Sequence, residues 1–363
     1  MIAQVSNGLL YICFAVVMGA CILGLIPEDK KTSITMPKKI VALAITLIPV
    51  LSFLSLLDLA ITLNPYREES FLATTGHVIL HIANGHAWVA LAILAIIFLI
   101  LFVVLREKKV LPLLYGIGLL LAFGMLVTQT VVGHAANMGS YPGALAHLFH
   151  YIAVTAWMGV LFITSWFSKN DNNWQAFLGW FTPFAIGCVS ILALSGMFMS
   201  YFLNEDLVAS WTLPYGQALL VKCLLFIPIL FFAFINSVLV RKRVKEDVQY
   251  SPRSWWRAES VIILVVLAVT AIMTEQEPPH NIAQTLVQGE SSILFQTFAS
   301  VPAGTNVIFA FNGLSVLFLA VGLLFLGCIL YSFLQKLSPY ISLVMTGLAV
   351  VSIYIGLMSG VTV

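Results

Sequence analysis

The sequence predicts an all-α fold: a polytopic membrane bundle of about ten transmembrane helices, with an eight-helix core, two further C-terminal helices and both termini outside. Of its 363 residues, 61% are hydrophobic and only 9% are charged, and the mean hydropathy is +1.03. Soluble domains carry about 25% charged residues, so this composition is typical of a chain that lies in a lipid bilayer. The apolar segments do not alternate with period two, as the strands of a membrane β-barrel would.

Ten apolar segments are long enough to cross a membrane, since about 20 helical residues at about 1.5 Å each span the hydrocarbon core. The first segment has no Lys or Arg near its start, unlike a secretory leader, so we expect it to be a retained helix. The predicted spans are residues 5–26, 39–63, 77–105, 111–132, 144–167, 178–203, 215–240, 258–275, 307–331 and 338–361.

The basic residues support this number of spans and orient the chain. All of the 17 Lys and Arg except Arg67 and Lys222 lie in the loops after the first, third, fifth, seventh and ninth spans. Cytoplasmic loops are enriched in Lys and Arg, so these loops are predicted to face the cytoplasm and both termini to face outward. The loop residues are Lys30, Lys31, Lys38, Lys39, Arg106, Lys108, Lys109, Lys169, Arg241, Lys242, Arg243, Lys245, Arg253, Arg257 and Lys336.

All seven histidines fall in the outer half of this topology. Three begin the third span, one ends the fourth, two begin the fifth and one lies in an outer loop. Neutral imidazole is a common metal ligand, so the outer face is predicted to bind cations. In chain order the histidines are His77, His81, His86, His134, His147, His150 and His280.

Helix geometry groups the histidines further. His77 and His81 are four residues apart and share a face, whereas His86 points nearly the opposite way on a continuous helix. On the fifth span, His147 and His150 lie about 60° apart around the helix axis. A single histidine at a helix end is commonly an interfacial residue, and this is the interpretation we favour for His86.

Methionines accompany the histidines. Met158 lies eleven residues after His147 and returns to its face about 16 Å deeper. Met197 and Met199 are two apart, so a regular helix directs only one of them inward, and Met138 lies in the outer loop after the fourth span. Imidazole with thioether suits copper, with sulfur favouring Cu(I) and imidazole accepting Cu(I) or Cu(II). Each methionine alone is more commonly a packing residue.

Two ionisable residues lie within apolar helices, where they are costly unless paired. Asp58 and Lys222 are predicted to neutralise one another, with Asp58 as a metal or proton ligand as the alternative. Lys222 can also extend toward the interface. Glu259, near the cytoplasmic end of the eighth span, is expected to be an interfacial charge, with a role as the inner counterpart of Asp58 in proton coupling as the alternative.

Several chemistries lack their sequence signatures. The five cysteines form no C-x-x-C motif, which argues against a thiolate relay or structural zinc site. No phosphate-binding loop is present, so ATP hydrolysis is not expected to drive transport. No nucleophile and base stand at a recognisable spacing, and we expect no enzymatic activity.

Several short fragments occur in an order and spacing that resemble a known family. They are Gly133-His134-Ala135, His147 before "HYIAVTAWMGVL", Ser195-Gly196, "WTLPYGQALLVK", Asn236 and "RAESVIILVVLAVTAIMTEQEPP". From roughly residue 133 to 279 the chain resembles the copper-resistance protein D (CopD) family of bacterial inner-membrane proteins. One extra residue precedes Tyr215 relative to the family pattern.

The resemblance implies copper transport across the cytoplasmic membrane, generally thought of as uptake, with copper captured at an outward-facing His/Met site. It also implies a CopD-like core at residues 1–275, an extracytoplasmic loop at 276–306 and a two-helix extension at 307–363. The expected partners are the copper ion, the lipid bilayer and an extracytoplasmic copper carrier protein, with no nucleic acid. The predicted ligands are His134, His147, His150, His77, His81, Met197, Met199 and Asp58, supported by Met158, Met138, His86 and Lys222.

Two alternative functions remain open. One is a copper-binding membrane chaperone that hands copper to an oxidase without transporting it. The other is a membrane haem b protein, because haem is bound by one histidine from each of two facing helices. His81 or His86 opposite His147 or His150 would provide such a pair.

Overall fold

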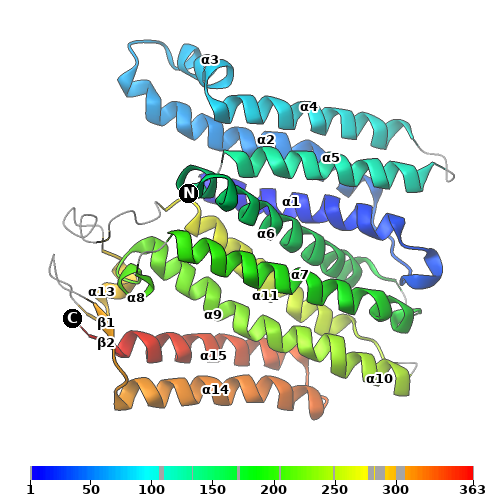
Figure 1. The fold of residues 1–363 in the computed structure, drawn as a ribbon. Coiled ribbons are helices and arrows are strands. Elements are labelled where there is room, and N and C mark those ends of the chain that lie inside the picture. Colours follow the sequence, from blue (N-terminus) through cyan, green and yellow to red (C-terminus); the bar gives the residue numbers. More distant parts are fainter. Residues whose placement is uncertain are drawn as a thin grey trace. The chain divides into compact units, whose positions relative to one another are not determined.

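Long apolar helices make up most of the computed structural model (Figure 1). It describes residues 2–105, 110–132, 134–169, 172–203, 206–247, 250–276, 282, 291–299 and 307–362, without the side chains of 2, 134–140 and 202–203. Within these ranges, ten helices are long and apolar enough to cross a membrane. The predicted all-α membrane fold and its ten spans are therefore confirmed.

The chain forms two units, Met1–Phe202 and Leu203–Val363, each described here by itself. The division of the chain at residues 275 and 306 stays a prediction. Unit 1 contains α1 (Ile2–Leu25), η1 (Glu28–Lys30), α2 (Lys38–Leu63), η2 (Asn64–Tyr66), α3 (Phe71–His81), α4 (Ala83–Val104), α5 (Leu111–Val131), α6 (His134–Phe167) and α7 (Trp174–Leu203). Unit 2 contains α8 (Leu207–Ser210), α9 (Pro214–Phe234), the π-helical turn η3 (Ile235–Leu239), α10 (Val240–Glu246), α11 (Arg253–Met273), α13 (Ile293–Gln296), β1 (Ile308–Phe309), α14 (Gly313–Leu334), α15 (Pro339–Ser359) and β2 (Val361–Thr362).

In unit 1, α1 packs against α2, α5 and α6. The contact with α6 is a close backbone approach: a Cβ atom on Gly159 would lie 2.0 Å from the Ala15 carbonyl oxygen, and one on Gly19 would lie 2.3 Å from the Gly159 carbonyl carbon. Only glycine, which has no Cβ, permits this separation. The two glycines therefore fix the position of α6, the helix that carries His147 and His150.

Two loops predicted to face the cytoplasm lie together in unit 1. The loop after α1 and the loop after α6 form a short antiparallel bridge, in which Thr35 N–H donates to the Phe167 carbonyl (3.0 Å) and Lys169 N–H donates to the Ser33 carbonyl (2.9 Å). The Trp180 indole N–H of α7 donates to the Lys30 carbonyl (2.8 Å). These basic loops thus share one end of the bundle, as the alternation of charge predicts.

The predicted third span is wrong in one respect, because residues 77–105 are not one helix. The chain becomes extended at Ile82 (φ −109°, ψ 142°), which separates α3 from α4. The first turn of α4 packs directly on the end of α3, where a Cβ on Gly85 would lie 2.1 Å from the Val78 carbonyl oxygen. Val78 in turn packs with Leu56 and Ala60 of α2 in a small apolar cluster. These contacts stabilise the bend, and the pattern of apolar residues does not reveal it.

In unit 2, α9 packs against α11, α14 and α15, and α14 and α15 form an antiparallel hairpin closed by the β1–β2 pair. Buried polar contacts tie the hairpin to α9. The Tyr354 hydroxyl donates to Gln217 Oε1 (2.6 Å), and Gln217 Nε2 donates to the Trp211 carbonyl (2.5 Å). The two C-terminal helices are therefore an integral part of this unit.

Candidate metal site

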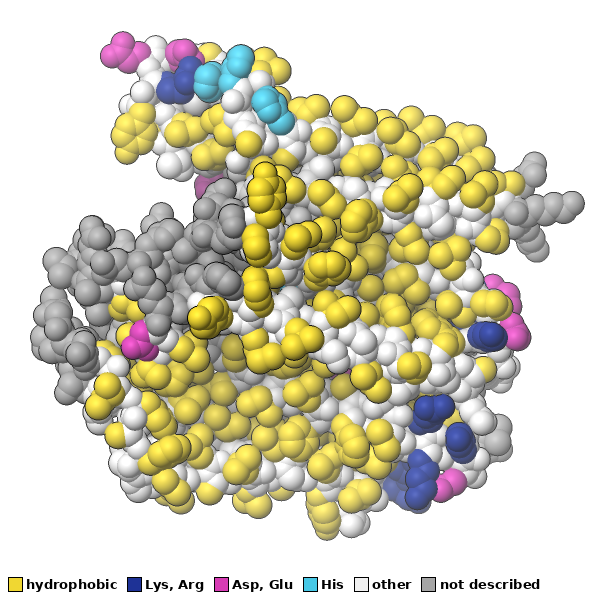
Figure 2. Space-filling model, viewed as in Figure 1, with side chains coloured by type: hydrophobic (Ala, Val, Ile, Leu, Met, Phe, Trp, Pro, Cys, Tyr) yellow, Lys and Arg dark blue, Asp and Glu magenta, His cyan; other side chains and the backbone are white. Residues whose placement is uncertain are grey.

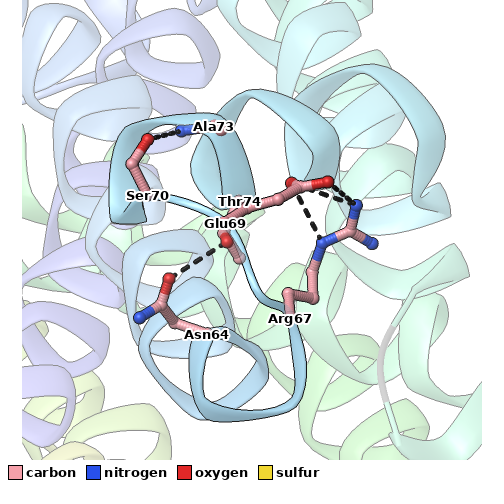
Figure 3. A network of polar contacts seen from close by, with 6 residues as sticks. All are labelled: Asn64, Arg67, Glu69, Ser70, Ala73 and Thr74. Carbon is pink, nitrogen blue, oxygen red and sulfur yellow. Dashed lines mark hydrogen bonds and ion pairs between the residues drawn. The ribbon is translucent and has the colours of Figure 1, made fainter.

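The turn between α2 and α3 is held by polar contacts (Figure 3). Ser70 caps α3 by accepting a hydrogen bond from the Ala73 N–H (3.3 Å), and the Thr74 hydroxyl donates to Asn64 Oδ1 (3.0 Å). Capping side chains satisfy backbone groups at a helix start that would otherwise lack partners. This network fixes where α3 begins, and so fixes the register of its histidines.

Two of the predicted ligands lie together on α3. The imidazole rings of His77 and His81 have their centroids 4.8 Å apart, at an interplanar angle of 36°. His77 is half-buried and His81 is exposed. Figure 2 shows histidine side chains beside acidic and basic ones over α3, at the edge of a largely apolar surface. Two neighbouring imidazoles can provide two nitrogen ligands to one metal ion.

His86 does not join this pair. Its Nε2 lies 2.8 Å from the Leu80 carbonyl oxygen. Since a carbonyl only accepts, Nε2 carries the hydrogen and donates it, so this nitrogen has no lone pair for a metal. His86 thus acts in the bend between α3 and α4, in line with the favoured interpretation of this residue.

The second group of predicted ligands lies at the contact between α6 and α7. His150 Nδ1 lies 3.0 Å from the Ser195 hydroxyl oxygen, which is 2.5 Å from the Ile191 carbonyl oxygen. Two oxygens at that separation need a hydrogen between them, and only the hydroxyl has one, so Ser195 donates to Ile191. Ser195 must therefore accept from His150, which places the imidazole hydrogen on Nδ1. In neutral His150 the lone pair then resides on Nε2, the atom able to bind a metal.

Aromatic residues position His147, one turn earlier on α6. Its ring stacks on Tyr151, with centroids 6.1 Å apart and an interplanar angle of 15°. Tyr151 is buried and makes edge contacts with Tyr11 and Phe14 of α1, both at 5.5 Å. The close approach of α1 and α6 therefore supports the ring of His147 through Tyr151.

Other predicted ligands fall outside the described part of the chain. The side chains of His134 and Met138 are not described, nor is His280. The backbone around the first two is described, and it corrects a prediction: residues 134–143 are the start of α6 and not a loop. About 20 Å of helix axis separates His134 from His147, because each of the thirteen intervening steps adds about 1.5 Å.

The methionines divide by burial. Met158 is 2% exposed, in the core of unit 1, whereas Met197 is 62% exposed and directed to the surface. Met199 is half-buried. Of the two methionines on α7, Met199 is thus the one directed inward, which agrees with the expectation that a helix can direct only one of them toward the bundle.

The structure also shows the surroundings of the three ionisable residues that were predicted to lie within or near the ends of the spans. Asp58 is exposed on α2 in unit 1, and Lys222 is half-buried on α9 in unit 2. Neither side chain forms an ion pair within its own unit, as far as the described residues go, and their mutual pairing stays a prediction. Glu259 contradicts its prediction as an interfacial charge: it is 2% exposed and hydrogen-bonded to Asn236 inside unit 2.

Across the described residues, no three His, Cys, Asp or Glu side chains lie close enough to form a metal site together. The structure instead provides two groups of two histidines, His77 with His81 and His147 near His150. Sequence reasoning missed the role of Ser195. Its signal was the Ser195-Gly196 fragment, which carries no chemistry until His150 is placed opposite it.

Comparisons with known proteins agree on one group of proteins. A model described as "Copper resistance protein D-like, N-terminal domain" matches residues 2–144, and one described as "Copper resistance protein D" matches residues 175–273. The chain is 26% identical over 198 residues to the copper transport protein CutJ of Bacillus subtilis (strain 168). That match covers 52% of this chain and 36% of the relative, so it spans about a third of the relative's length. No solved structure matches the chain.

Proposed function

Because this chain belongs to the copper resistance protein D family, we propose that it transports copper ions across a bacterial cytoplasmic membrane, in the direction of uptake. The observation that carries the proposal is the match of two family models, which together cover both the N-terminal helices and the α7–α11 region. Copper is the substrate in this account and not a resident cofactor.

His150 is the first residue that we assign to copper. The Ser195 hydroxyl accepts from its Nδ1, so in the neutral imidazole the lone pair is on Nε2, the nitrogen that we assign to copper. Hydrogen bonding to the second nitrogen is how proteins orient histidine ligands and raise their basicity. His147, one turn away and supported by Tyr151, is the second proposed ligand.

The His77 and His81 pair is the proposed entry site. It lies on α3, a short helix that is not one of the ten membrane spans, and His81 is exposed. An exposed pair exchanges metal readily with water or with an extracytoplasmic carrier protein. Protons compete with copper for imidazole, so binding at both sites should weaken as the medium is acidified.

Thioethers provide the proposed deeper positions. Met199 of α7 is half-buried, and Met158 lies about 12 Å along the α6 axis beyond His150, since eight residues rise by about 1.5 Å each. Sulfur ligands favour Cu(I), so copper passing from imidazole to thioether would travel in the reduced state. We propose that transport proceeds without an enzymatic step.

Metal content tests the site. Full-length protein is purified in detergent, loaded with copper, zinc or no metal, and analysed by mass spectrometry beside His147→Ala, His150→Ala and His86→Ala. We expect stoichiometric copper that falls in the first two variants and not in His86→Ala, because Nε2 of His86 is bonded to the backbone. Copper that is indifferent to the first two changes would remove this site.

Two further readouts separate the alternatives. A copper chaperone would bind copper at the same residues but would not increase copper inside sealed vesicles. A haem b protein would show a Soret absorption band when purified without added metal. Absence of that band, with copper accumulation in vesicles, is the result expected of a transporter.

A further inference from the structure

Unit 2 contains a buried polar pair that copper capture does not use. Glu259 of α11 is 2% exposed and Asn236 of η3 is 4% exposed. The Asn236 amide nitrogen donates to Glu259 Oε2 at 2.6 Å. Both residues belong to the same unit, and both side chains are buried in the folded chain. An ionisable residue buried in a membrane bundle is by default a functional candidate.

The backbone is irregular at this position. Asn236 is the second residue of η3, a five-residue π-helical turn between α9 and α10. A π turn inserts an extra residue into a helix, which redirects the side chains and loosens the backbone hydrogen bonding. Such turns occur mainly as single insertions within α-helices, and frequently at functional sites. The irregularity therefore coincides with Asn236, the polar partner of Glu259 among the described residues.

No basic group neutralises Glu259 in the described part of the chain. The helices α14 and α15 carry no charged residue, and the only titratable groups on α15, which packs on α11, are Tyr340 and Tyr354. On α9 the single charge is Lys222, about 20 Å along the helix from Asn236 at about 1.5 Å per residue; Tyr215 and Cys223 lie at the same end.

Most of the remaining described charges of unit 2 are at its basic end, on and just after α10, at the start of α11 and in the turn after α14, while Asp206 precedes α8 and Glu275 follows α11. Arg243 lies over the rings of Tyr250 (5.0 Å) and Phe333 (5.4 Å), and Lys242 pairs with Glu246 (3.9 Å). None of them forms an ion pair with Glu259 among the described residues. The other charged side chains there are Arg241, Lys245, Asp247, Arg253, Arg257 and Lys336.

The hydrogen-bonding groups of Asn236 and Glu259 indicate which ligand the two residues bind. Asn236 Oδ1 is buried without a donor among the described residues. Glu259 as a carboxylate would add a second problem, a buried charge with one neutral donor, and such charges are costly in an apolar interior. One proton on Glu259 removes the charge and adds an O–H donor beside an acceptor that has none. A proton thus satisfies both groups.

We propose that Glu259 and Asn236 form a proton-binding site at the basic end of unit 2, with Glu259 protonated at rest. Release gives the carboxylate and one proton to water at that end, and uptake of one proton from the same water restores the acid. No other group changes its charge. The role of the site in transport rests on the proposed copper transport. In that process, release or uptake of a proton by Glu259 compensates for the charge of the moving copper ion.

Infrared spectroscopy tests the site without copper. A protonated carboxyl has a C=O stretching band that shifts in D₂O. We expect this band in the full-length protein at neutral pH, its loss in Glu259→Gln and its retention in Glu246→Gln, a matched change at an exposed glutamate of the same end. Absence of the band from the wild type, or its retention in Glu259→Gln, would overturn the proposal.

A second variant keeps the proposal testable if Glu259→Gln does not fold. Asn236→Ala removes the hydrogen bond to Oε2, so the C=O band should move to higher wavenumber; an unchanged band would contradict the assignment. In proteoliposomes containing a pH-sensitive dye, copper addition should move protons in the wild type and not in Glu259→Gln. Copper binding at the histidines is measured separately, so failure of the copper site and failure of the proton site give different results.

Discussion

Replacing Ser195 by alanine tests whether a single hydrogen bond from His150 to the neighbouring helix prepares this histidine to bind copper. The hydroxyl accepts from His150 Nδ1 at 3.0 Å and donates to the Ile191 carbonyl at 2.5 Å. Without it, the hydrogen of neutral His150 is free to reside on Nε2. In that tautomer Nε2 has no lone pair, and the atom that we assign to copper cannot bind it.

The expected loss is a factor of about 10 to 100 in copper affinity, the usual effect of removing a partner that orients a ligand. This corresponds to about 1.4 to 2.7 kcal/mol, since each factor of ten is about 1.4 kcal/mol. Ser195 is buried, so solvent does not readily replace the hydroxyl. Ser195→Thr keeps the hydroxyl and should recover part of the affinity.

Copper affinity is measured by competition with a chromophoric chelator on detergent-purified protein. The histidine tautomer is measured by nitrogen NMR on protein labelled at its imidazoles. Ser190→Ala, at an exposed position on the same helix, is the control and should retain wild-type affinity. If Ser195→Ala bound copper as tightly as the wild type, with His150 unchanged in the NMR spectrum, the reasoning would be refuted.

Other changes test the packing and the ligand set. Gly159→Val should lower the free energy of unfolding by about 3 kcal/mol, because its Cβ would meet the Ala15 backbone and force α1 and α6 apart; an unchanged thermal midpoint by tryptophan fluorescence would count against this. Tyr354→Phe leaves Gln217 Oε1 without its donor and should cost about 1 to 3 kcal/mol in the same assay, with no effect if the hydrogen bond is absent. Met197→Leu should leave copper affinity within about twofold, since Met197 is directed to the surface and Met199 is the methionine of α7 that faces the bundle; a larger loss would make Met197 a ligand.

The membrane fold was predictable because its signals are local. Each span is a run of apolar residues, and the alternation of basic loops follows from charge alone. The bend at Ile82 was not predictable in the same way. It depends on Gly85 touching the end of α3 and on Val78 packing against α2, contacts between segments that hydropathy does not encode. The start of α6 was missed for a related reason, because polar and small residues at 134–143 are typical of a loop.

In the candidate site, too, local sequence patterns predicted some features and contacts between distant segments determined the others. The i, i+4 spacing of His77 and His81 predicted that they share a face, and their rings do lie together. The partner of His150 lies 45 residues away on another helix, so no spacing rule identifies it. Glu259 was misjudged because its position near a helix end suggested the interface, whereas Asn236 and the surrounding helices bury it.

Copper uptake into sealed vesicles is the most direct test of transport. Full-length protein is reconstituted into liposomes, copper is added outside, and the copper inside is measured over time for the wild type, His150→Ala and His86→Ala. We predict accumulation above protein-free liposomes in the wild type and in His86→Ala, and its loss in His150→Ala. Wild-type protein that binds copper but accumulates no more than protein-free liposomes would contradict transport, and would identify a protein that holds copper without moving it.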